Sequence, residues 1–207
     1  MDAEMVRDYA LEVSGLLVEK IGGPSVRPYQ PEGVWEAIAM NGSTTSRYVR
    51  DSGENLYRRS LYTFVKRMAP PASLDIFNAP NREQCAVRRE RTNTPLQALV
   101  TMNDEQFVEA ARRFAENILK NGGATDEERF QWAGRRLLSR EFRADELSVL
   151  VESLSRLTAF YGDHAADAAS LIKTGESKAD ASLDPTILAA WTMLCNEMMN
   201  LDEVLNK

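Results

Sequence analysis

The stretch of sequence that is most informative about the fold is Arg88-Arg89-Glu90-Arg91-Thr92-Asn93-Thr94-Pro95-Leu96-Gln97-Ala98-Leu99. Three arginines fall within four residues and lead directly into a predicted helix start. Asn93 or Thr94 can act as the N-cap, and Pro95 suits the first helical position. A helix N-terminus flanked by arginines favours a bound anion. The stretch also divides the chain into a loop-rich part before it and a helical part after it.

The part after Thr94 is predicted to be a bundle of helices joined by short turns, which favour antiparallel packing. Helices are expected at 95–102, at 147–161 and at 165–173. Three more are expected to begin at predicted caps: at Asn103 or Asp104, at the capping box of Thr125 and Glu128, and at Asp184-Pro185. Two apolar stripes follow the helical period, Phe107, Ala110, Ala111, Phe114 and Ile118 in one helix and Ile187, Ala190, Trp191, Leu194 and Met198 in the last.

The part before Pro95 has fewer regular signals. An amphipathic helix carries Val6 to Leu17 and is expected to stop at Gly22-Gly23-Pro24, and a short helix is expected at 32–40 with an end at Asn41-Gly42-Ser43. Residues 56–68 fit one face of a helix but also have strand propensity, and helix is favoured. Residues 72–94 read as a long irregular connection. We therefore predict one all-α domain over 1–207, with a loop-rich section at 1–94 and a multi-helix bundle at 95–207.

Composition limits the classes of partner. The chain has 207 residues and a formal net charge of −6, which excludes general nucleic-acid binding. Between residues 47 and 95 there are ten Lys/Arg and five Asp/Glu, so the middle of the chain is basic. No apolar run is long enough to cross a membrane. The first five residues carry acid where a signal peptide carries base, so we expect no signal peptide in this segment.

The cysteines and the histidine give no metal or haem signature. Cys85 and Cys195 form no CxxC, and with His164 alone a zinc-ligand cluster is not expected. The CxxCH motif of covalent haem is absent as well, so no cofactor is expected in this chain. The two cysteines could pair in an exported protein, but two free thiols are favoured.

The arginines of the middle are the first candidate site: Arg58, Arg59, Arg82, Arg88, Arg89 and Arg91, beside the helix start at Thr94. Guanidinium groups bind carboxylate or phosphate in bidentate fashion, so these residues could hold an anion. The favoured alternative is structural. In that interpretation the arginines bond to backbone carbonyls and to Asp/Glu side chains and fix the irregular chain.

Aromatic and acidic side chains offer two weaker candidates. The aromatic residues of the first part could stack on sugars, although at this spacing they are favoured as core: Tyr29, Trp35, Tyr48, Tyr57, Tyr62 and Phe64. Asp51 and Glu54 could serve in acid–base chemistry, but nothing in their spacing separates them from surface carboxylates. No phosphate-binding glycine loop or nucleophile elbow is present.

Three stretches resemble the planctomycete-specific domain of unknown function: residues 22–31 (GGPSVRPYQP), residues 56–64 (LYRRSLYTF), and Arg88 through Ala110 with RTNTPLQAL and NDEQFVEA. The tail Asn200-Leu201-Asp202-Glu203 is also similar to the family's usual end. The resemblance implies a C-terminal module of larger exported proteins that carry cytochrome-c-like domains. It therefore implies an extracytoplasmic location and a chain excised from a longer parent. The family has no assigned catalytic residue.

The sequence thus predicts an accessory or interaction domain whose partners are other domains of the parent protein, including a cytochrome-c-like one. No catalytic motif is visible, and a non-catalytic role is favoured. The alternatives are a ligand-binding or enzymatic module with an anion site near Thr94, and a carbohydrate-binding surface built on the aromatic residues.

Overall fold

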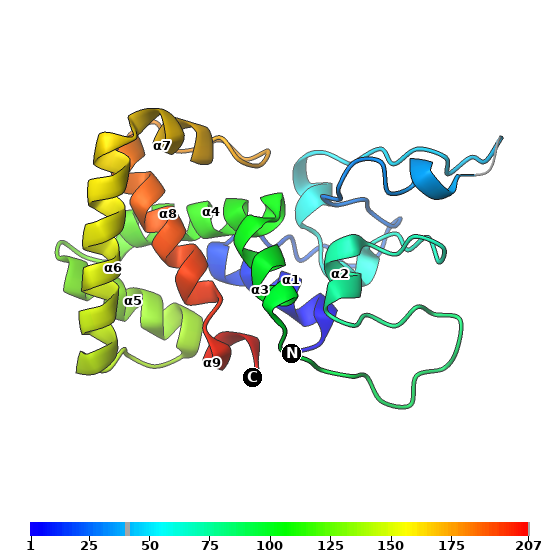
Figure 1. Ribbon diagram of the computed structural model, residues 1–207, viewed down its shortest axis with the longest axis horizontal. Helices are drawn as coiled ribbons and strands as arrows, with labels where there is room; N and C mark the ends of the chain where they lie inside the picture. The colour runs from blue at the N-terminus through cyan, green and yellow to red at the C-terminus, as the bar shows by residue number, and fades with distance from the viewer. Residues whose placement is uncertain (40–41, 207) are drawn as a thin grey trace. The chain divides into compact units, whose positions relative to one another are not determined.

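The structure, a computed structural model, describes residues 1–39 and 42–206. Its regular elements are helices (Figure 1): α1 (Ala3–Ser14), α2 (Ala72–Ile76), α3 (Pro95–Asn103), α4 (Glu105–Asn121), α5 (Asp126–Leu138), α6 (Ala144–Asp163), α7 (Ala165–Leu171), α8 (Pro185–Met199) and α9 (Asp202–Leu205), with short 3₁₀ helices η1 (Glu36–Ile38), η2 (Gly53–Tyr57) and η3 (Ser60–Tyr62). Over these described ranges β-pairing is confined to isolated bridges. The all-α prediction is confirmed. No helix in the described ranges is both long and apolar enough to span a membrane.

The described chain separates into two compact units. Unit 1 comprises Met1–Tyr9 and Leu17–Val100, and unit 2 comprises Ala10–Leu16 and Thr101–Lys207. The division therefore falls inside α1 and inside α3, whereas the sequence suggested a change of character before Pro95. That both units belong to one domain stays a prediction.

In unit 2, α8 is the central helix. It packs against α4, α6 and α7 (Figure 1), and residues on all of its sides are buried, including Leu188, Trp191 and Cys195. A helix enclosed on several sides is apolar around its circumference, so its core extends beyond the predicted stripe. Ile187, predicted to be in that stripe, is instead 37% exposed because it lies in the first turn of α8.

The helix caps of unit 2 are those that the sequence predicts. The Asp104 side chain accepts a hydrogen bond from the Gln106 amide at 3.0 Å, and Asp184 accepts from the Thr186 and Ile187 amides ahead of Pro185. Thr125 and Glu128 form the reciprocal capping box of α5. Each cap satisfies amide groups that the first turn of a helix leaves unpaired. The apolar stripe of α4 from Phe107 to Ile118 is buried, as predicted.

A buried charged cluster on α4 holds residues 175–183, the connection between α7 and α8. Glu109, Arg112 and Glu116 are each at most 1% exposed. Arg112 donates to Glu116 at 2.5 Å and to the Ser177 carbonyl at 2.5 Å, while Glu109 accepts from the Ser177 amide at 2.6 Å. Gly175 lies at a φ of +89°, and a Cβ there would come within 2.3 Å of Glu109. Side chains of α4 thus replace backbone pairing for this irregular segment.

In unit 1, buried arginines hold the irregular backbone. Arg7 of α1 is 3% exposed and donates to the carbonyls of Leu56, at 2.6 Å, and Arg58, at 2.9 Å. Asp8 accepts from the Ser60 amide at 2.7 Å. Because α1 already pairs with this backbone, residues 56–68 do not form the helix that was predicted. They form the end of η2, all of η3 and the isolated bridges Val18–Arg58, Val26–Thr63 and Lys66–Ala69.

The first predicted helix ends earlier than expected. It stops at Ser14 because Gly15 adopts a φ of +74°, a conformation that glycine tolerates and that ends helices. Asn117 of α4 donates to the Ser14 carbonyl at 2.9 Å and satisfies one of the groups left at that end. The sequence pattern instead predicts an end at Gly22-Gly23-Pro24.

Three shorter differences complete the comparison with the predicted elements. Of the helix expected at 32–40, only η1 forms within residues 32–39, and residue 40 lies outside the described residues, as does the first residue of the expected end Asn41-Gly42-Ser43. Helices α2 and α9 were not predicted, since four or five residues are too few to show a helical period. In the connection expected at 72–94, the residues after α2, 77–94, are irregular, as expected.

The cysteines are free thiols, Cys85 exposed and Cys195 buried.

Candidate functional site

The N-terminus of α3 is held by a small polar network in unit 1. The Thr94 hydroxyl accepts from the Gln97 amide at 3.3 Å, and the Gln97 side-chain oxygen accepts from the Thr94 amide at 2.9 Å, which is a capping box. The Gln97 side-chain nitrogen donates to the Ile76 carbonyl and to the Thr92 hydroxyl, each at 3.0 Å. Asn78 also donates to Thr92, at 2.7 Å. The chain is therefore fixed immediately after Arg91.

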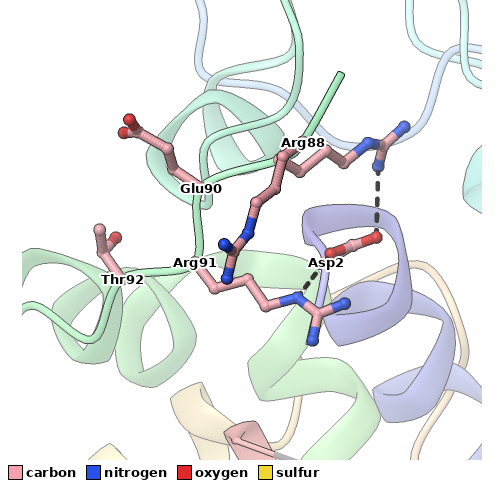
Figure 2. Close-up of a pocket in the computed structure, with 6 residues that line it drawn as sticks. Asp2, Arg88, Glu90, Arg91 and Thr92 are labelled. Carbon is pink, nitrogen blue, oxygen red and sulfur yellow. Dashed lines mark hydrogen bonds and ion pairs between the residues drawn. The ribbon is translucent and has the colours of Figure 1, made fainter. Parts of the chain in front are cut away.

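The residues before this network form the arginine segment, Arg88–Thr92. Together with Asp2 they line an open hollow of about 780 Å³. Figure 2 shows the side chain of Arg91 pointing toward Asp2, while that of Glu90 points away. A hollow of this size bounded by guanidinium groups has the chemistry to receive a carboxylate or a phosphate group.

Two of the three arginines already contact carboxylates. Arg91 Nε donates to Asp2 Oδ1 at 2.9 Å, and Arg89 Nη1 lies 3.8 Å from Asp2 Oδ2 (Figure 2, dashed lines). Arg89 Nη1 also donates to Glu4 Oε2 at 2.6 Å. Arg91 keeps 60% of its side chain exposed and Arg89 keeps 38%. Ion pairs this exposed contribute little stability, so an incoming carboxylate can compete for these guanidinium groups.

Arg88 differs from its neighbours. Within residues 1–39 and 42–206, its guanidinium has no hydrogen-bond or ion-pair partner, and the residue is exposed. Arginine carries five N–H donors at a fixed spacing and stays charged at all physiological pH values. The arginine segment therefore presents one available guanidinium beside two that are engaged by the acidic side chains of Asp2 and Glu4.

The structure does not bring all the predicted site residues together. Arg88, Arg89 and Arg91 line the hollow, whereas Arg58, Arg59 and Thr94 are not among its lining residues. The Arg59 guanidinium is 60% exposed and lies 3.6 Å from the Asp8 carboxylate. The hydroxyl of Thr94 is used in the capping box of α3.

Arg58 has a structural role of the kind that the sequence analysis favoured for the whole set. It is 2% exposed and donates to the carbonyls of Lys20, Gly22 and Pro24 at 2.5–3.0 Å. Its guanidinium also lies over the Tyr62 ring, 3.9 Å from the centroid. Arg58 thus fixes the backbone of residues 20–24.

Asp2, Glu4 and Thr92 were missed by the sequence analysis. Asp2 and Glu4 lie more than 80 residues from their arginine partners, and no local pattern reports such a pairing. The capping box of Thr94 and Gln97 could have been found, since a Thr followed three residues later by Gln is its signature.

Two of the six aromatic residues favoured as core, Tyr29 and Trp35, are buried, whereas Tyr48, Tyr57, Tyr62 and Phe64 are half-buried. Trp35 and Tyr29 are 1% and 5% exposed, and Trp35 packs on Tyr48 and Phe64 with ring centroids 5.0 Å and 5.6 Å away. Cations lie over these rings, Lys66 at 4.8 Å from the Trp35 centroid and Arg50 at 4.6 Å from that of Tyr29. Neither Trp35 nor Tyr29 presents an open face on which a sugar could stack.

Other reactive groups lie apart from the arginine segment in the sequence. Burial raises the pKa of the Cys195 thiol well above its usual value, so the thiol stays protonated. His164 is exposed, and its ring is stacked on Phe160 at 4.3 Å. In the described part of the chain no three His, Cys, Asp or Glu side chains are grouped for a metal ion.

Comparison with known proteins gives one match. Residues 1–154 match the family PSD1, described as "Protein of unknown function (DUF1553)", and this range is well over half of the 207 residues. The matched range contains the arginine segment and α3. No curated protein and no solved structure matches the chain.

Proposed function

The chain belongs to the PSD1 family of proteins of unknown function, and from this premise we propose that it is a non-catalytic interaction domain that contacts a carboxylate-bearing partner through the arginine segment. The observation that carries the proposal is the free guanidinium of Arg88, held beside two exposed arginines on a backbone that the Thr92–Gln97 network fixes. A fixed backbone lowers the entropy lost when a partner binds.

The partner in this proposal is another domain of a larger parent protein. The resemblance of residues 22–31, 56–64 and 88–110 to the planctomycete-specific domain supports an exported parent with a cytochrome-c-like domain. Such a domain carries carboxylates both in acidic side chains and in haem propionates. Either source has the charge and the two-oxygen geometry that guanidinium groups bind.

The test begins with the complete coding sequence around this segment, in which we expect a signal peptide and a CxxCH motif upstream. The encoded haem domain is then titrated with the 207-residue chain by calorimetry at low and high salt. We expect saturable binding that weakens at least tenfold in Arg88→Ala/Arg91→Ala and weakens with salt, because exposed charge pairs are screened.

Arg156→Ala is the matched control, since Arg156 is 74% exposed on α6 and removing it leaves the arginine segment intact. It should bind as the unmodified chain does. Absence of binding, or binding that ignores both salt and the arginine variant, would contradict the proposal. Absence of an upstream CxxCH motif would remove the cytochrome partner alone.

The hollow supports a second candidate, a site for a small free anion. Its volume of about 780 Å³ exceeds what a single carboxylate of a partner needs. Titration with inorganic phosphate, followed through the arginine Nε–H signals by NMR, separates the two. Saturable shifts at Arg88 and Arg91 without any partner domain favour the small anion, and unchanged signals favour the partner surface.

A further inference from the structure

Helix α3 has its polar and apolar sides reversed. Gln97 and Thr101 are 2% and 4% exposed, whereas Leu96, Leu99 and Met102 are 51%, 57% and 38% exposed. At about 100° per residue, the three apolar side chains span an arc of about 120°, and the two buried polar ones lie on the opposite side of the helix. A surface helix ordinarily buries its apolar arc, so the pattern of α3 is that of a helix with an uncovered apolar face.

The buried polar side has an identifiable role. Within unit 1, Gln97 caps α3 and bonds to the Ile76 carbonyl and the Thr92 hydroxyl. These hydrogen bonds fix the rotation of the helix about its axis. Leu96 and Leu99 are consequently held outward, and single scattered apolar residues on a surface do not explain two leucines one turn apart on the same helix.

Both leucines follow directly on the arginine segment and belong to the same unit of the fold. The surface formed by residues 88–99 therefore combines guanidinium groups with an apolar ridge. A partner that covers it must bring carboxylates to Arg88 and Arg91 and apolar side chains to Leu96 and Leu99. A partner with positive charge facing Arg88 and Arg91 would place like charges together. A partner with polar groups facing Leu96 and Leu99 would bury those groups without hydrogen bonds.

We infer that residues 88–99 are the docking surface for an amphipathic helix of the partner, with carboxylates at one end and an apolar stripe along the rest. A helix fits because Leu96 and Leu99 form a straight ridge, which packs into the groove between the i, i+3 and i+4 side chains of a second helix. This inference rests on the proposed function and adds the shape and apolar character of the partner.

The probe is a synthetic amphipathic helical peptide with leucines at i, i+3, i+4 and i+7 and three glutamates at one end. Two matched peptides replace the glutamates by lysines or the leucines by serines. Fluorescence anisotropy with the full 207-residue chain measures each dissociation constant. We expect the Glu/Leu peptide to bind, and both matched peptides to bind at least about tenfold more weakly, the factor associated with one well-buried leucine or one charged contact.

Leu96→Ser/Leu99→Ser should weaken binding of the Glu/Leu peptide at least about tenfold, and Arg88→Ala should weaken it at low salt only. Val149→Ser is the matched control, because Val149 is an apolar residue of α6 that is 65% exposed. It should leave the dissociation constant unchanged. Circular dichroism of each variant checks that the helices remain, as expected for side chains on the surface.

Three results would overturn the inference. One is binding that Leu96→Ser/Leu99→Ser does not change, and another is equal binding of the glutamate and lysine peptides. The third is a dimer of the chain alone in sedimentation that the leucine variant dissociates, which assigns the face to a second copy. Partner binding lost in Arg88→Ala but kept in the leucine variant would leave the proposed function standing and remove only this inference.

Discussion

The two units of this protein use arginine in contrasting ways. In unit 2 the buried Arg112 pairs with carboxylates of its own helix, within a helical core that is otherwise mainly apolar. In unit 1 the buried Arg7 and Arg58 bond mainly to backbone carbonyls and hold a chain with little regular structure. Thirty residues after Arg58, the guanidinium of Arg88 bonds to nothing in the described chain. The difference teaches that an arginine-rich sequence does not define one role, because burial and the partner acceptors decide it.

The largest effect is expected in unit 2. Arg112→Ala leaves Glu109 and Glu116 buried without their common cation, and removing one member of a buried charge network costs about 3–5 kcal/mol. Urea unfolding should show this loss, and amide exchange of residues 175–183 should rise most, since Arg112 bonds to Ser177. Arg156→Ala, on the surface, should stay within about 0.5 kcal/mol of the unmodified chain. If Arg112→Ala also lost no more than about 0.5 kcal/mol, the cluster would not be what holds this segment.

An intermediate effect is expected for Arg58→Ala in unit 1. The change removes charged donors from the carbonyls of Lys20, Gly22 and Pro24. The free energy of unfolding should fall by about 2 kcal/mol, because water replaces only part of these hydrogen bonds. Amide exchange at residues 20–26 should accelerate. Arg59→Ala is the neighbouring control, and its side chain is 60% exposed, so it should change stability by less than about 0.5 kcal/mol.

A smaller, pH-dependent effect is expected where Arg140 joins Glu146 and Glu203. Hydrogen bonding to Arg140 lowers the pKa of Glu146 to about 2 and also lowers the pKa of Glu203. A carboxyl with a lowered pKa in the folded state stabilises the fold above its unfolded pKa, and this contribution is lost as pH falls toward the folded pKa. The thermal unfolding temperature should therefore decrease as the pH is lowered from about 4.5 to about 2.

Glu146→Gln keeps a side chain that can cap α6 but removes the titrating group. Its unfolding temperature should fall less steeply over the same pH range than that of the unmodified chain. Parallel curves would show that Glu146 does not titrate with folding.

The smallest effect on stability is expected on the docking surface. Arg88→Ala and Leu99→Ser remove exposed side chains, so each should shift the free energy of unfolding by less than about 0.5 kcal/mol. Differential scanning fluorimetry against the unmodified chain checks this. A loss above about 1 kcal/mol in either variant would mean that the side chain is part of the fold.

The sequence predicted the helical part better than the irregular part, for a physical reason. Caps at Asp104, Thr125 and Asp184 and the stripe of α4 are local, so residues a few positions apart report them. The conformation of residues 56–64 depends instead on Arg7 and Asp8, about 50 residues away. No periodicity within the segment carries that information.

The candidate site shows the same limit. The segment Arg88–Leu99 was identified from its composition, and the position before Pro95 predicted a cap at Asn93 or Thr94, of which the structure uses Thr94. The sequence could not predict which arginines share a hollow. Arg89 and Arg91 are held there by hydrogen bonds to Glu4 and Asp2, which lie more than 80 residues away in the sequence. The burial of Arg58 likewise depends on residues 20–24.

The division of roles between Arg58 and Arg88 is the central claim, and one paired measurement tests it. Urea unfolding of Arg58→Ala and Arg88→Ala is compared with the unmodified chain under identical conditions. We predict a loss of about 2 kcal/mol in Arg58→Ala and a change below about 0.5 kcal/mol in Arg88→Ala. Equal destabilisation by both variants would contradict the account, because Arg88 would then hold the fold as Arg58 does.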